Sequence, residues 1–176
     1  LVLSYVAMRK DDKAGLVTFN EYFDTFVPAS KQVGQMQTLL ENLYKQETTF
    51  GETDFSALCG HLGKHVNKRS FLVLYTNFSN MTSLNRQLVY LQQLARQHRV
   101  LVVFFEDADL KEYIAGKSVT TEDYYRHVIA EKFAFEKRLI VSTLKQHGIY
   151  SLLTTPDKLS IDVINKYLEM KSRQLL

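Results

Sequence analysis

Polar side chains that could bind a ligand follow the strand-like run at residues 70–76. This run reads Ser-Phe-Leu-Val-Leu-Tyr-Thr and breaks at Asn77-Phe78-Ser79-Asn80, so a polar cluster lies at the carboxyl end of a buried strand. Binding sites in open α/β sheets lie at that end. A second polar edge, Gly51-Glu52-Thr53-Asp54, opens an amphipathic helix. Hydroxyl, carboxylate and free backbone N–H groups could then face one crevice, which predicts a polar or metal-dependent binding site.

Thr53 and Asn77 are the candidate metal ligands of this crevice. The Thr53 hydroxyl could bind a hard cation, or it could only cap the helix that begins near Asp54, which is worth about 1 kcal/mol. Asn77 could give Mg²⁺ an amide oxygen directly or through water, although asparagine is as often a turn residue. Replacing a carboxylate about 4 Å from a cation by an amide removes a few kcal/mol of attraction. Binding of Mg²⁺ or Mn²⁺ is therefore expected to be weak or absent.

A pair of aspartates, Asp107 and Asp109, follows the apolar run at residues 100–105 and supports a rival, enzymatic interpretation. The pair is similar to that of haloacid-dehalogenase-type phosphatases, in which one carboxylate attacks phosphorus and the other handles a proton. Lys111 stands where those enzymes have Thr or Val, and the pair follows a late strand rather than the first. The alternative is acidic charge at a helix start, which the helix dipole favours.

Three further residues have side chains that can bind metals or act as nucleophiles. His61 and His65 stand four apart on one predicted helix, a spacing that can bind zinc, but no third ligand is evident and solvated histidines are expected. Cys59 is the only cysteine, which excludes an internal disulfide, suits a reducing compartment and predicts a small core residue. Glycine-rich dinucleotide, Walker and nucleophile-elbow motifs are absent, so the common nucleotide and hydrolase functions lose their main support.

Helices and strands alternate along the chain and would position these residues. Apolar runs predict strands at 15–19, 23–27, 70–76, 100–105 and 149–153, with the second pairing antiparallel to the first. Helical spacing predicts helices at 1–9, 33–43, 55–66, 82–95, 120–147 and 161–168, and another is expected to start at 106–109. Thr82 is the predicted N-cap of the fourth helix, and Gly148 is a natural residue to end the fifth.

The apolar positions of three of these helices predict which faces they bury. Expected core residues are Val33, Met36, Leu40 and Leu43 in the second helix, Tyr125, Val128, Ile129, Phe133, Ile140 and Leu144 in the long one, and Ile161, Ile164, Tyr167 and Leu168 in the last. The alternation predicts an α/β fold: a doubly wound, mostly parallel sheet with helices on both faces and one antiparallel edge strand.

Composition bounds the class of protein. The 176 residues suit one domain, expected over 1–176, and 45% hydrophobic and 23% charged residues are typical of globular chains. The net charge of +3 is scattered rather than gathered, so nucleic acid is not the favoured partner. No apolar run approaches the roughly 20 residues of a membrane span. Because the chain begins at Leu1 within an apparent helix, we expect it to be a fragment of a longer protein.

Five segments, in order, resemble the bacterial proteins of the domain of unknown function 58 family, whose core resembles a von Willebrand factor A domain. They are Lys13-Ala14-Gly15-Leu16-Val17-Thr18-Phe19, Phe26-Val27-Pro28, Glu52-Thr53-Asp54-Phe55, Leu74-Tyr75-Thr76-Asn77-Phe78 and Val163-Ile164-Asn165-Lys166-Tyr167-Leu168-Glu169-Met170-Lys171. Many such domains hold a divalent cation at a metal-ion-dependent adhesion site. The resemblance implies that Thr53 is the threonine of that site and that Asn77 stands where its aspartate is expected. The Asp-x-Ser-x-Ser loop of the site is absent.

The resemblance also implies a domain that lacks its first strand. In the family that strand lies at the sheet centre, between the strands at 15–19 and 70–76, which cannot pair across a gap of about twice 4.8 Å. We therefore expect an upstream segment, a swapped partner or a sheet that closes the gap.

The resemblance implies a function without catalysis. We expect a protein-interaction domain for scaffolding or assembly, cytoplasmic, with a partial metal site and with an AAA-type ATPase as partner of a membrane-tethered parent. The alternatives are a metal-dependent phosphoryl-transfer enzyme that uses Asp107 and Asp109, and a scaffold that binds no metal.

Overall fold

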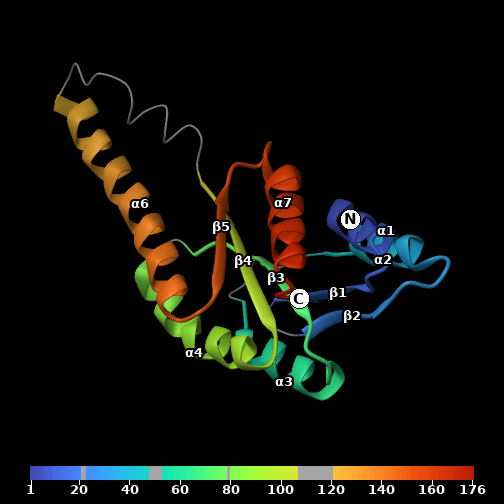
Figure 1. Cartoon of the computed structure of the whole chain (residues 1–176). Helices are drawn as coiled ribbons and strands as arrows, with labels where there is room; N and C mark the ends of the chain where they lie inside the picture. Colours follow the sequence, from blue (N-terminus) through green and yellow to red (C-terminus); the bar gives the residue numbers. More distant parts are fainter. Residues whose placement is uncertain (21–22, 48–52, 79, 107–120) are drawn as a thin grey trace. The chain divides into compact units, whose positions relative to one another are not determined.

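The computed structural model describes residues 1–20, 23–47, 53–78, 80–106 and 121–176. These residues form six helices and five strands, which Figure 1 labels along the chain. The backbone divides into two compact units, Leu1–Asn67 and Lys68–Leu176, called here the first and second units. None of the described helices combines the length and apolar character that crossing a membrane requires.

The first unit is built around a two-stranded antiparallel hairpin. Its elements are α1 (Val2–Arg9), β1 (Ala14–Phe19), β2 (Phe23–Ser30), α2 (Gln35–Tyr44) and α3 (Phe55–His65). β1 pairs with β2 as the sequence predicts. Pro28 lies within β2, and a strand with only one partner tolerates a residue that cannot donate a ladder hydrogen bond.

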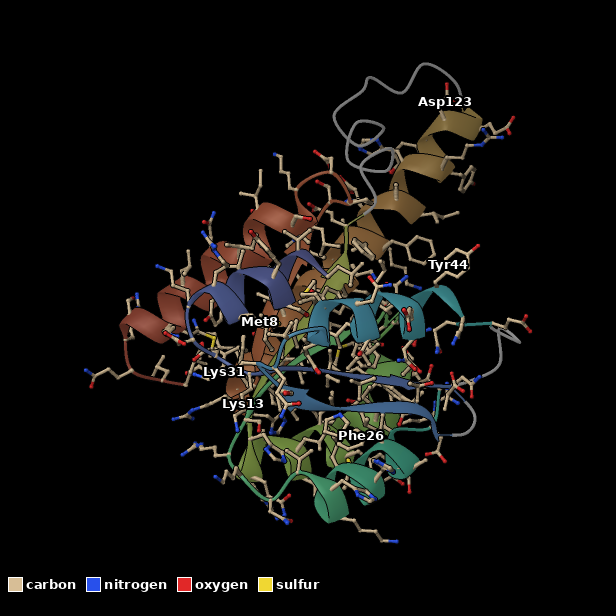
Figure 2. All side chains as sticks on the ribbon, turned by 90° about the vertical axis from the view of Figure 1, so that its right-hand side faces the viewer. Met8, Lys13, Phe26, Lys31, Tyr44 and Asp123 are labelled. Atoms are coloured by element: carbon tan, nitrogen blue, oxygen red, sulfur yellow. The ribbon has the colours of Figure 1, made fainter. Side chains whose placement is uncertain are left out.

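Side chains of helices contact both faces of the hairpin. On one face Ala14 and Val27 pack with Leu39 of α2, and Met8, Leu16 and Met36 surround this cluster. On the other face Phe26 is directed toward α3, where its ring lies 5.0 Å from that of His61 (Figure 2). Val27 and Phe26 are neighbours on β2, so successive side chains point to opposite faces as a strand requires.

Gln35 determines which face of α2 meets the hairpin. Its buried side-chain amide donates hydrogen bonds to Ala14 O at 2.8 Å and Pro28 O at 3.0 Å. Leu39, four residues on, lies on the same face and is buried. The predicted core face was therefore wrong in part: Val33 precedes the helix, and Leu40 and Leu43 are exposed.

The second unit is a three-stranded parallel sheet with helices on both faces (Figure 1). Its elements are β3 (Phe71–Tyr75), α4 (Met81–Gln97), β4 (Arg99–Phe105), α6 (Thr121–Gln146), β5 (Tyr150–Thr154) and α7 (Leu159–Ser172). β4 lies between β3 and β5. Residues 100–104 are at most 2% exposed, which explains their continuous apolar run.

The mixed α/β class is confirmed, but the strands form two sheets instead of one continuous sheet. β1 pairs with β2, and β3 lies at the edge of the parallel sheet with β4 as its neighbour. Within the described ranges, no strand pairs with the second edge of β1 or of β3.

The helix ends confirm one prediction and correct another. Gly148 follows α6 with a φ of 71°, the left-handed conformation expected of it. The N-cap of α4 is Asn80 rather than Thr82: its side chain accepts a hydrogen bond from Ser83 N at 2.9 Å, and Ser83 closes a capping box. Asparagine is among the strongest N-cap residues, so the helix begins two residues earlier.

Only the second half of α6 is buried as predicted. Ile140 and Leu144 are fully buried, because this half packs against β5 and α4. The first half diverges from the sheet (Figure 1), and Tyr125, Val128, Ile129 and Phe133 are exposed instead of forming core. In α7 the prediction held for Tyr167, whereas Ile161 and Leu168 are exposed and Val163 and Met170 are buried.

We predict that Gly15→Ala destabilises the first unit. A Cβ at this position would lie 2.7 Å from Val27 O and 2.8 Å from Ala29 N, both backbone atoms of β2. Because the hairpin must shift to admit it, the free energy of unfolding should fall by about 1 to 3 kcal/mol in urea denaturation. The matched control is Gly60→Ala in α3, where a Cβ meets nothing within 4 Å. This change should stabilise by up to about 1 kcal/mol, and equal effects of the two would contradict the account.

His98 links the end of α4 to the start of β3 and is 2% exposed. Its Nδ1 accepts a hydrogen bond from Ser70 N at 3.3 Å, so the neutral ring carries its proton on Nε2. Burial lowers the pKa of His98 below its usual 6.5. In the pH range below about 6.5, His98 therefore binds a proton less readily in the folded chain than in the unfolded chain.

We predict that stability falls as the pH drops below about 6.5, by up to about 1.4 kcal/mol per pH unit for one such proton. Urea denaturation between pH 8 and pH 5 measures this loss. His98→Gln should reduce the pH dependence, whereas His147→Gln, which removes an exposed histidine, should retain it. An unchanged slope in His98→Gln would show that this ring is not the group responsible.

Candidate functional site

Thr53 lies in the first unit, directly before α3, and is half-buried. It does not cap the helix, contrary to the simpler of its two interpretations. Asp54 is the N-cap, and its Oδ1 accepts hydrogen bonds from Ser56 N at 2.7 Å and Ala57 N at 3.1 Å. A carboxylate satisfies the helix N-terminus and its dipole better than a hydroxyl does, which explains the choice. Glu52 lies outside the described residues.

Asn77 lies in the second unit, at the carboxyl end of β3, and is exposed. Its amide oxygen accepts a hydrogen bond from Lys137 Nζ at 2.6 Å, and the same ammonium donates to Phe78 O at 2.8 Å. Lys137 comes from α6, so these bonds also fix the middle of that helix to the loop after β3. The candidate metal ligand is thus already bound by a positively charged group of the chain.

The surroundings of Lys137 are largely apolar. Its Nζ lies 5.5 Å from the centre of the Phe104 ring, and both Phe104 and Phe78 are buried. The ring face attracts the cation. Burial nevertheless lowers the pKa of Lys137, because it removes water from the charged form.

A divalent cation bound to Asn77 would lie close to the Lys137 ammonium in this arrangement. Mg²⁺ binds oxygen at about 2.1 Å, so an ion on the Asn77 amide oxygen would lie within about 5 Å of Lys137 Nζ. Repulsion between the two charges is then about 7 kcal/mol at an effective dielectric of 20. No cluster of three or more His, Cys, Asp or Glu among the described residues is placed to hold a metal and offset this cost.

The other predicted site residues lie in the first unit or outside the described residues. Thr53 belongs to the first unit and Asn77 to the second, and their convergence stays a prediction. Asp107 and Asp109, the pair of the phosphoryl-transfer alternative, lie outside the described residues. At the carboxyl end of β5 the Thr154 hydroxyl donates to Asp162 Oδ2 at 2.5 Å, so these two polar groups are bound to each other.

The rings of His61 and His65 are stacked on each other, and His65 is exposed as expected whereas His61 is half-buried. Their ring centres lie 4.2 Å apart, and both rings contact Phe26 of β2. Burial, followed by the charges of His65 and Lys64, lowers the pKa of His61. Cys59 is buried as expected, and burial followed by the charge of Asp54 raises its pKa to about 11. The thiol is therefore protonated at neutral pH and is a poor nucleophile.

Sequence reasoning missed Lys137, which determines the chemistry at Asn77. The contact joins residues 60 positions apart, so no local motif contains it. One signal was present: Lys137 continues the helical spacing of Phe133, Ile140 and Leu144, where an apolar residue would be expected. A lysine on the buried face of a helix requires an oxygen partner, and Asn77 and Phe78 supply it.

Comparison with protein families identifies the chain. Residues 1–121 match the family described as Protein of unknown function DUF58. Because the match spans more than half of the chain, covering the first unit and the beginning of the second, the chain belongs to this family. No curated protein matches it, and no solved structure matches it.

We predict that Asp54 and Thr53 differ in their effect on stability. Asp54→Ala removes both cap hydrogen bonds and should lower the free energy of unfolding by about 0.5 to 2 kcal/mol. Thr53→Ala removes a hydroxyl that does not cap the helix and should cost less than about 0.5 kcal/mol. Urea denaturation of the two variants beside the wild type measures both effects. A larger loss in Thr53→Ala would restore threonine as the cap and contradict the assignment.

Proposed function

We propose that the chain is a protein-interaction domain rather than an enzyme. The observation that carries this proposal is the apolar surface of α6, defined by Tyr124, Tyr125, Val128, Ile129, Phe133 and Phe135. These side chains are between 45% and 66% exposed. Large apolar side chains gathered on one exposed element mark interaction surfaces.

The charges around this surface favour a protein partner over a lipid surface. Arg126 pairs with Glu122 at 2.6 Å, and His127 lies 3.5 Å from Glu131. An apolar centre with a rim of both charge signs is typical of protein interfaces. A helix that lies on anionic membranes has Lys and Arg along its polar face, whereas here Glu122 and Glu131 would be repelled.

Family resemblance supports finer parts of the proposal. We propose a von Willebrand factor A-like arrangement in which Thr53 and Asn77 belong to a degenerate adhesion site that acts without a metal. The proposed partner to test first is an AAA-type ATPase. We propose that the two meet in the cytoplasm and that the chain is part of a longer, membrane-tethered protein. The buried central strand β4 and the parallel order β3, β4, β5 are compatible with this arrangement.

We predict that the apolar surface of α6 binds the partner. Calorimetric titration of the full chain with a purified AAA-type ATPase of the same cell should detect binding. The double variant Ile129→Ser and Phe135→Ser should weaken that affinity by about tenfold or more, equivalent to about 1.4 kcal/mol. Ile129 and Phe135 are exposed, so the variant should keep the fold, which circular dichroism checks.

The controls are Val89→Ser on α4 and Ile161→Ser on α7, which remove apolar side chains of similar exposure from other helices. Both should bind as the wild type does. Equal binding by the α6 variant would refute this surface, and a lack of binding by the wild type would remove the ATPase from the proposal.

A further inference from the structure

The ammonium of Lys137 has bonding capacity that the described residues do not use. Lysine has three N–H donors, and Asn77 Oδ1 and Phe78 O accept two of them. In the part of the chain that the structure describes, the third N–H has no acceptor, and Lys137 forms no ion pair with a carboxylate. Its present partners are a neutral amide, a peptide carbonyl and an aromatic ring.

Among the residues that the structure describes, this arrangement holds the positive charge of Lys137 in place without a carboxylate partner. Three elements contribute to it: α6 supplies the ammonium, the loop after β3 supplies the oxygens, and Phe104 of β4 supplies the ring. Because Lys137 is half-buried, water stabilises its charge less than on an open surface. An anionic group that reached the third N–H would therefore gain more than it gains from a freely solvated lysine.

We propose that Lys137 is a tethered cation at the carboxyl end of β3, and that it binds a carboxylate group of a ligand there without a metal ion. A carboxylate matches a single open N–H and a single positive charge. A phosphate group carries more charge and is usually held by several N–H groups or by an arginine. The proposal concerns the end of β3 and does not depend on the partner of α6.

The proposal predicts a saturable response to small carboxylates in NMR spectra of the full chain. The probes are aspartate with an acetylated amino end and an amidated carboxyl end, and acetylglycine, which present a side-chain and a terminal carboxylate. The signals of the Lys137 ammonium and the Asn77 side-chain amide should shift, with half-saturation at about 10 to 100 mM, as one charge-assisted hydrogen bond implies. Sodium chloride at equal ionic strength should not reproduce the shifts.

Variants separate the role of Lys137 from a general charge effect. Lys137→Met should reduce the response of the Asn77 amide by about fivefold or more, and Lys137→Arg should retain most of it. Lys132→Met removes an exposed lysine of the same helix and should respond as the wild type does. If Lys137→Met does not fold, as its amide spectrum would show, Lys137→Gln removes the charge in its place and should reduce the response in the same way.

Three results would overturn the proposal. The first is a wild-type response to carboxylates that is no larger than the response to chloride, or one that Lys137→Met retains. The second is a stronger response to inorganic phosphate than to either carboxylate. The third is selective broadening of the Asn77 side-chain signal by stoichiometric Mn²⁺, which would place a metal where the ammonium is proposed to act. The relative responses to the two probes identify the kind of carboxylate preferred.

Discussion

The contact between the Lys137 ammonium and the oxygens after β3 is the interaction on which the proposed chemistry at this end of the parallel sheet depends. It satisfies Asn77 and Phe78, fixes α6 to the loop after β3, and places a positive charge where the family resemblance implies a metal. The resemblance alone suggested a weakened metal site, because an amide had replaced a carboxylate. The geometry goes further, since the amide oxygen already has a cationic partner. The asparagine oxygen and the lysine ammonium are complementary to each other, in the way that an aspartate carboxylate and a metal ion would be.

The parallel sheet sets how much of α6 is available for binding. β4 is buried at the sheet centre, and the second half of α6, with Ile140 and Leu144 buried, packs against β5 and α4. Beyond Lys137 toward its N-terminal end, the helix diverges from the sheet and its large apolar residues Tyr125, Val128, Ile129 and Phe133 are exposed, although Ala130 is buried. One helix thus serves as core in its second half and as a proposed interaction surface in its first. Lys137 lies between these two parts of the helix.

The helices, strands and turns could largely be predicted from the sequence, because they depend on residues that are close together in the chain. The buried run of β4, the antiparallel pairing of β1 with β2 and the glycine after α6 were all confirmed. The buried faces of the helices and the contacts between side chains were less predictable, because they depend on residues that are distant in the sequence. The face of α2 follows from hydrogen bonds of Gln35 to Ala14 and Pro28 across the unit. The exposure of Ile129 and Phe133 follows from where the sheet ends, which helical spacing alone does not reveal.

The most direct test of this account is the titration of the Lys137 ammonium itself, followed by lysine-selective NMR on the full chain. The account predicts a pKa below the usual 10.5, because burial disfavours the charge, and a slowly exchanging ammonium signal that Asn77→Ala weakens. It would be contradicted by an ordinary lysine pKa with rapid exchange that Asn77→Ala leaves unchanged. That result would mean that Lys137 is solvated and that the end of β3 is open to another cation.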